Sequence, residues 1–160
     1  MTGEDIRWGI ASFRRPEVCA NATVATLLSS GVHPEAITVF LSDPAEKKEY
    51  VEALTGTGVS IREGAPGAAG NKRSIQRFYE PETRLMSCDD DLKGLFTKPI
   101  EGSRLEPLTV SLPELASGVF DRAAEAGARL WGLSGAANSQ PHRDSWVTLH
   151  HRMFFRLSHP

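Results

Sequence analysis

Short β-rich apolar runs alternate with helical segments along the N-terminal part of the chain. The clearest run, residues 37–42, reads Ile-Thr-Val-Phe-Leu-Ser, and similar runs occupy residues 7–12 and 84–88. An apolar run without polar alternation is typical of a strand that is covered on both faces. Strands that alternate with helices usually pair in parallel, since the helix returns the chain to the starting edge of the sheet. The order therefore predicts an α/β fold, with a mostly parallel sheet and helices on both faces.

Turn and capping residues set the bounds of the remaining elements. Asp43 suits the N-cap of a helix, and Pro44 suits its first position. The glycine-rich segment 64–70 lacks the spacing of a Walker A or dinucleotide-binding motif. We expect helices at 18–30, 44–54, 71–79 and 113–126, strands at 7–12, 37–42, 59–62, 84–88, 108–112 and 130–133, one last strand within 146–157, and a loop over the site at 93–107.

Composition narrows the class of protein. A chain of 160 residues fits one domain. Its net charge of -2 gives no overall positive potential for binding nucleic acid, although it does not exclude a local basic patch. No apolar run approaches the about 18 residues of a membrane span, and the N-terminus lacks a secretory pattern. Cys19 and Cys88 have no metal-type or disulfide-type spacing. We therefore expect a cytoplasmic protein without a membrane segment, with two reduced thiols.

Three adjacent carboxylates, Asp89-Asp90-Asp91, directly follow the apolar run 84–88. In an open α/β sheet, ligands bind at the carboxyl ends of the strands. Adjacent carboxylates repel one another, and a divalent cation compensates this repulsion while sharing its oxygen ligands with substrate phosphates. The pattern favours an Asp-x-Asp metal–diphosphate site, and a solvated acidic turn is the alternative interpretation.

Several segments in a fixed order carry a resemblance to a known family. They are Ser-Phe-Arg-Arg-Pro at 12–16, Leu-Leu-Ser-Ser-Gly-Val-His-Pro at 27–34, Ile-Thr-Val-Phe at 37–40, the glycine-rich segment with Asn-Lys-Arg at 64–73, and Ser-Cys-Asp-Asp-Asp-Leu-Lys-Gly-Leu at 87–95. This order resembles GT-A-type nucleotide-sugar glycosyltransferases, and more narrowly the bacteriophage TET-associated glycosyltransferases. The resemblance covers residues from about 6 to 95, and a weaker similarity includes 130–133 and Asn138.

The resemblance implies a fold, a reaction and an acceptor. It implies a GT-A-like, Rossmann-like single domain over 1–160, in which 6–95 bind the nucleotide sugar and 96–160 form an acceptor side shorter than is usual in the family. The donor would be a UDP-sugar used with Mn2+ or Mg2+. The acceptor would be the hydroxyl of 5-hydroxymethylcytosine, or a related hydroxymethylpyrimidine, in phage DNA.

Two other functions stay open at this point. One is a GT-A glycosyltransferase with a cell-envelope sugar or lipid as acceptor. The other is a truncated, non-catalytic module that binds the nucleotide alone. A nucleotidyltransferase is disfavoured, because its basic glycine-rich signature near the N-terminus is missing.

The resemblance also assigns roles within the acidic run. In similar enzymes the first Asp faces the ribose and the last one the cation, so Asp91 is the expected metal ligand, with Asp89 assisting. Asp90 would point away or reach the sugar, because neighbours on an extended backbone alternate sides. One of the two adjacent arginines should face the nucleotide, since Arg offers a fork of donors to phosphate. The expected donor-binding residues are Ser12, Arg14, Arg15, Asn71, Arg73, Asp89 and Asp90.

The C-terminal third supplies weaker candidates. Asp144 and His142 are the expected catalytic bases, and His150, or its neighbour His151, is the expected third metal ligand. No local motif marks any of them, and adjacent histidines are often surface residues.

Two tryptophans and a set of basic residues are further candidates. We expect Trp146 to contact the acceptor and Trp131 to lie in the core. The basic set either faces DNA or is an ordinary solvated surface, and it consists of Lys72, Arg73, Arg77, Arg84 and Lys93.

Overall fold

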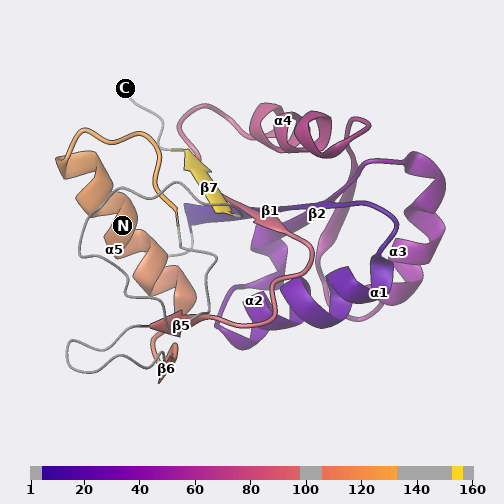
Figure 1. The fold of residues 1–160 in the computed structure, drawn as a ribbon, viewed down its shortest axis with the longest axis horizontal. Coiled ribbons are helices and arrows are strands. Elements are labelled where there is room, and N and C mark those ends of the chain that lie inside the picture. Colours follow the sequence, from indigo (N-terminus) through magenta and orange to yellow (C-terminus); the bar gives the residue numbers. More distant parts are fainter. Residues whose placement is uncertain (1–4, 98–105, 133–152, 157–160) are drawn as a thin grey trace.

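The computed structural model describes residues 5–97, 106–132 and 153–156. Its main sheet has five strands in the order β3-β2-β1-β4-β7 (Figure 1). β1 to β4 are parallel, and β7 pairs antiparallel with β4. The predicted mostly parallel sheet is therefore confirmed. The strand bounds are β1 (Ile6–Ser12), β2 (Ile37–Leu41), β3 (Ser60–Glu63), β4 (Arg84–Asp89) and β7 (Met153–Arg156).

Helices cover both faces of this sheet, as predicted. After β1 the chain forms one continuous helical stretch of α1 (Pro16–Val18), the π-helical turn η2 (Cys19–Val24) and α2 (Ala25–Ser29). After β2 come η4 (Pro44–Glu46) and α3 (Lys47–Ala53), while the short turn η3 (Pro34–Ala36) precedes β2. In Figure 1, α1, α2 and α3 lie below the sheet and α4 (Ala68–Phe78) lies above it. This division is expected, since the chain moves outward from β1 to β3 and then returns to β4.

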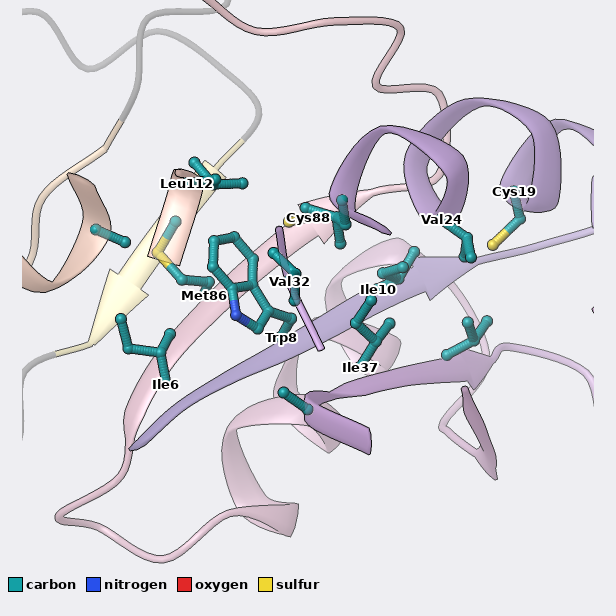
Figure 2. Packing of buried hydrophobic residues seen from close by; sticks show 14 of the residues in the cluster. Ile6, Trp8, Ile10, Cys19, Val24, Val32, Ile37, Met86, Cys88 and Leu112 are labelled. Carbon is teal, nitrogen blue, oxygen red and sulfur yellow. The ribbon is translucent and has the colours of Figure 1, made fainter. Parts of the chain in front are cut away.

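The larger core lies between the sheet and the α1–α3 side. Ile6, Trp8 and Ile10 project from the same side of β1 (Figure 2), and all three are buried. Helix α5 (Leu112–Glu125) packs into the same cluster through Leu112, Ala116 and Phe120.

A smaller cluster on the other face joins α4 to the sheet. Phe40, Ile75 and Leu85 form it, with Ala11 and Tyr79 packed against it. Gly9 lies under this helix, and a Cβ placed there would come 2.4 Å from Ile75 Cγ2. A glycine in β1 therefore lets α4 lie close on the strand.

Two predicted strands are wrong. Residues 108–111 form no strand, and Leu112 is instead the first residue of α5, where its N–H donates to Ser30 O at 2.9 Å. Residues 130–132 also form no strand, and Trp131 packs edge-on against Phe120 with ring centroids 5.1 Å apart. Leu108 and Trp131 pack against the larger core, while Val110 and Leu130 are exposed. A short apolar run does not by itself distinguish this situation from a buried strand.

Other bounds shift by a few residues. α4 begins at Ala68, so the end of the glycine-rich segment is its first turn. The loop predicted at 93–107 contains a small antiparallel pair, β5 (Phe96–Thr97) with β6 (Glu106–Pro107). β7 falls within the last predicted strand, and 146–152 lie outside the described residues. Helices in the described parts of the chain lack the length and apolar character that a bilayer crossing requires.

Candidate functional site

The carboxyl ends of β1 and β4 lie side by side at the point where the strand order reverses. The chain goes from β1 outward to β2 and β3, and then returns to β4 on the other side of β1. In open α/β sheets the ligand crevice lies outside the strand ends at such a point. Ala11 is paired with Asp89 in the β1–β4 register, so the next residue of each segment, Ser12 and Asp90, lie opposite one another at this end of the sheet.

A closed set of hydrogen bonds joins the two strand ends. Arg15 donates its backbone N–H to the Tyr50 hydroxyl at 3.2 Å, and the Tyr50 hydroxyl lies 2.6 Å from Ser12 Oγ. Ser12 Oγ donates to Asp90 Oδ2 at 2.6 Å, and the Arg15 guanidinium binds Asp90 Oδ1. A serine hydroxyl has one hydrogen, which goes to Asp90, so Tyr50 is the donor to Ser12. Burial raises the pKa of Tyr50 above its ordinary value, which keeps this hydroxyl protonated at neutral pH.

The three aspartates occupy three different environments. The Asp89 side chain is 26% exposed and pairs with Lys72 Nζ at 2.9 Å. The Asp91 side chain is 29% exposed and lies 3.7 Å from the Arg15 guanidinium. Asp90 is only 2% exposed, and both of its carboxylate oxygens are bound within the protein.

Asp90 was expected to point away from the donor or to reach the sugar, and its carboxylate turns inward, away from solvent. Ser12 and Arg15 are the two donors that hold it there. Asp89 and Asp91 are therefore the carboxylates of this run that solvent reaches.

The backbone of the acidic turn is held from beneath by the helical stretch after β1. Thr23 Oγ1 donates to Asp89 O at 2.7 Å and accepts from the Leu92 N–H at 2.9 Å, so one side chain spans the turn. Thr26 adds a bond to Leu92 O at 3.1 Å. Thr23 belongs to the π-helical turn η2, and such turns are frequent at functional sites. The turn that carries Asp89 and Asp91 is thus preformed.

The two adjacent arginines diverge, and the expectation that one of them faces the nucleotide stays a prediction. Arg14 has a left-handed backbone with φ 54°, and its guanidinium lies 4.8 Å from the centre of the Phe13 ring. Glu46 accepts the Arg14 backbone N–H at 2.8 Å and lies 3.7 Å from Arg14 Nε. Arg15 turns to Asp90 and Asp91 instead. Phe13 directly follows β1 and is 49% exposed, so it presents an aromatic surface beside the two arginines.

The first turn of α4 departs from the expected donor contacts. Asn71 is buried, and its Nδ2 donates to Phe40 O at 2.8 Å and to Ser12 O at 3.4 Å. The amide therefore joins α4 to the ends of β1 and β2 and lies below the surface that a donor would contact. Arg73 is exposed on α4. Lys72, which the sequence placed only in a basic set, is the residue of this turn that meets Asp89.

Basic residues of the predicted DNA-facing set have different surroundings. Lys72 pairs with Asp89, and Arg84 pairs with Asp121 of α5. Arg73, Arg77 and Lys93 are exposed. The set is therefore not one continuous group of exposed side chains.

Sequence reasoning missed the residues that organise the site: Thr23, Glu46 and Tyr50. Their roles depend on which backbone groups the fold brings within reach, and no local motif announces them. The remaining candidates, Asp144, His142, His150, His151 and Trp146, lie outside the described residues.

The carboxylates fit a cation that arrives with a phosphate ligand. Within residues 5–97, 106–132 and 153–156, no cluster of three or more His, Cys, Asp or Glu side chains could hold a metal ion by itself. Mg2+ is commonly bound by one or two carboxylates together with substrate phosphates and water. Asp89 and Asp91, both reached by solvent on one preformed turn, match that donor set.

Comparison of the chain with protein-family models finds no match, and comparison with curated proteins finds none either.

Proposed function

We propose that this chain is a metal-dependent GT-A-type glycosyltransferase that uses a UDP-sugar as donor. One observation carries the proposal. The Ser12–Arg15 segment and the Asp89–Asp91 segment, far apart in the sequence, meet at the carboxyl ends of β1 and β4, where the strand order reverses. These are the segments whose residue types suit a nucleotide diphosphate, and a doubly wound sheet binds nucleotides at this place.

In this proposal, different residues bind the phosphates, the base and the metal ion of the donor complex. Arg15 and Lys72 place two positive charges beside the acidic turn, where they can contact phosphate oxygens. The exposed ring of Phe13 offers a stacking surface for the base, and Arg14 lies over that ring. Asp89 and Asp91 would hold Mn2+ or Mg2+, which neutralises the charge on the diphosphate leaving group as the sugar–oxygen bond breaks.

The acceptor side of the proposal comes from the resemblance. It assigns the acceptor as the hydroxymethyl group of 5-hydroxymethylcytosine, or a related hydroxymethylpyrimidine, in phage DNA. In this proposal Asp144 or His142 takes the proton of the acceptor hydroxyl, and His150 completes the metal ligands. The protein would then work in the cytoplasm of an infected bacterial host.

A transfer assay tests the proposal. Purified protein is incubated with Mn2+, a panel of UDP-sugars and a duplex that carries 5-hydroxymethylcytosine, and the mass of the DNA is measured. We expect the mass of one hexose to be added to this duplex and none to an unmodified duplex. Asp91→Asn should abolish transfer, while Asp121→Asn, at an exposed aspartate on α5, should preserve it.

Two other outcomes would replace the proposed acceptor or activity. Transfer to a cell-envelope sugar or lipid, with none to DNA, would keep the donor site and replace the acceptor. Metal-dependent UDP binding without transfer to any acceptor would indicate a nucleotide-binding module.

A further inference from the structure

Two side chains from the segment after β2 hold successive backbone N–H groups of the loop after β1. Glu46 accepts the N–H of Arg14 at 2.8 Å, and Tyr50 accepts the N–H of Arg15 at 3.2 Å. Glu46 and Tyr50 are four residues apart, so they lie on the same side of the turn that runs from η4 into α3. The loop is thus bound at two consecutive points by one face of one element.

This attachment determines which arginine meets the crevice. Arg14 adopts φ 54°, a conformation that is unfavourable for a residue with a Cβ and that persists only where its surroundings enforce it. Beyond this residue, the side chain of Arg15 reaches Asp90 and Asp91, while that of Arg14 is 71% exposed. The left-handed residue therefore separates the two guanidinium groups.

Tyr50 has a second link to Arg15 through side chains. Its hydroxyl donates to Ser12, and Ser12 donates to Asp90, which binds the Arg15 guanidinium. The bonds form a circuit that begins at the backbone N–H of Arg15 and ends at its guanidinium. Hydrogen bonds in such a chain strengthen one another. Tyr50 is 0% exposed, so any effect on a ligand must pass through this circuit.

We propose that Tyr50 is a positioning residue that orients the Arg15 guanidinium toward an anionic group of the bound nucleotide. The role in binding rests on the proposed function, whereas the orientation of Arg15 is a property of the protein alone. Phenylalanine would fill the same space but would supply neither the acceptor for Arg15 nor the donor for Ser12. The variant Tyr50→Phe therefore removes the circuit and keeps the packing.

The chain offers a matched control at its other tyrosine. Tyr79 is partly buried and its hydroxyl oxygen is buried, but it packs against Phe40 in the smaller cluster on the opposite face of the sheet. Tyr79→Phe removes the same hydroxyl group from a place with no contact to the site. A general effect of losing a buried tyrosine hydroxyl would appear in both variants.

The first experiment is a double-mutant cycle on UDP binding, measured by calorimetry with Mn2+. Tyr50→Phe should raise the dissociation constant about three- to tenfold, the range expected when the Arg15 guanidinium loses one hydrogen bond to the nucleotide, and Tyr79→Phe should leave it unchanged. In the background Arg15→Met, Tyr50→Phe should have no further effect, because its target is gone. Unchanged affinity in Tyr50→Phe, or the same loss with and without Arg15, would overturn the proposal.

A second readout separates this proposal from the proposed function. The Nε–H signal of Arg15 in 15N-correlated spectra of the unliganded protein reports whether the guanidinium is held. It should be sharp in the wild type and in Tyr79→Phe, and exchange-broadened in Tyr50→Phe. If the wild type does not bind UDP, the proposed function fails, and this signal still decides the positioning role. A sharp Arg15 signal in Tyr50→Phe would refute that role, and Ser12→Ala, which cuts the same circuit, replaces Tyr50→Phe if that variant does not fold.

Discussion

Gly64→Ala should destabilise the fold through Asn71, which lies in α4, the next element along the chain. Gly64 directly follows β3, and a Cβ placed there would come 1.9 Å from Asn71 Oδ1 and 3.1 Å from Leu41 O. Real Cβ atoms do not approach so closely, so the Asn71 side chain must move. The amide of Asn71 donates to Phe40 O at 2.8 Å, and this bond joins α4 to β2.

The expected magnitude follows from two contributions. Overpacking of a closely packed place costs about 1–3 kcal/mol. Loss of the partner of a buried carbonyl costs about 1–3 kcal/mol more, if the amide rotates away from Phe40 O. Because the two contributions share one rearrangement, we expect a decrease of about 2–4 kcal/mol in the free energy of unfolding.

Urea denaturation followed by circular dichroism measures this change, and Gly118→Ala is the matched control. Gly118 lies within α5, and a Cβ there would meet no atom within 4 Å. Its replacement should raise the free energy of unfolding by about 0.5–1 kcal/mol, since alanine favours a helix interior. In the background Asn71→Ala, which removes the clashing atom, Gly64→Ala should cost much less. Wild-type stability of the single variant Gly64→Ala would refute the argument.

Two further predictions concern the site turn and the buried thiols. Thr23→Val should lower the free energy of unfolding by about 1–3 kcal/mol, because Asp89 O and the Leu92 N–H lose their partner. In the same urea assay, Thr23→Ser should retain most of that stability. Equal stability of Thr23→Val and wild type would contradict the assigned contacts. Burial raises the pKa of Cys19 and of Cys88 from 9.0 to about 12, so the unfolded chain releases these protons at a lower pH than the folded chain does. Below pH 9.0 the thiols contribute no pH dependence to stability, and between pH 9.0 and about 12 the free energy of unfolding should fall as the pH rises. Cys19→Ala should reduce this fall. A stability that does not change with pH over that window would refute the burial of the thiols.

The parallel sheet could be predicted from the sequence because its strands carry their signal locally. Residues 37–42 and 84–88 are mostly apolar without polar alternation, a pattern typical of a strand between two layers of helices. The position of the acidic run could be predicted in the same way, because the run follows a strand and ligands bind at the carboxyl ends of strands in such a sheet. Leu112 was assigned to a strand because it is apolar, but the first residue of a helix that packs on the core can be apolar too. The N–H of Leu112 donates to Ser30 O, a contact that the local sequence does not reveal.

Roles within the site could not be read from the sequence in the same way. Asp89, Asp90 and Asp91 are chemically identical, and only the donors supplied by Ser12 and Arg15 turn the middle one inward. The same holds for Tyr50, whose partners lie 38 and 35 positions away in the chain. Such roles arise from tertiary contacts between the ends of different strands, so no spacing within one segment reveals them.

We propose that the carboxyl ends of β1 and β4 bind a nucleotide diphosphate together with a divalent cation at Asp91. Calorimetric titration of UDP into the protein, once with Mn2+ and once with EDTA, tests it most directly. We expect binding with Mn2+, little or none with EDTA, and loss of the metal-dependent binding in Asp91→Ala. Equal affinity with and without the metal, or unchanged binding in Asp91→Ala, would contradict it.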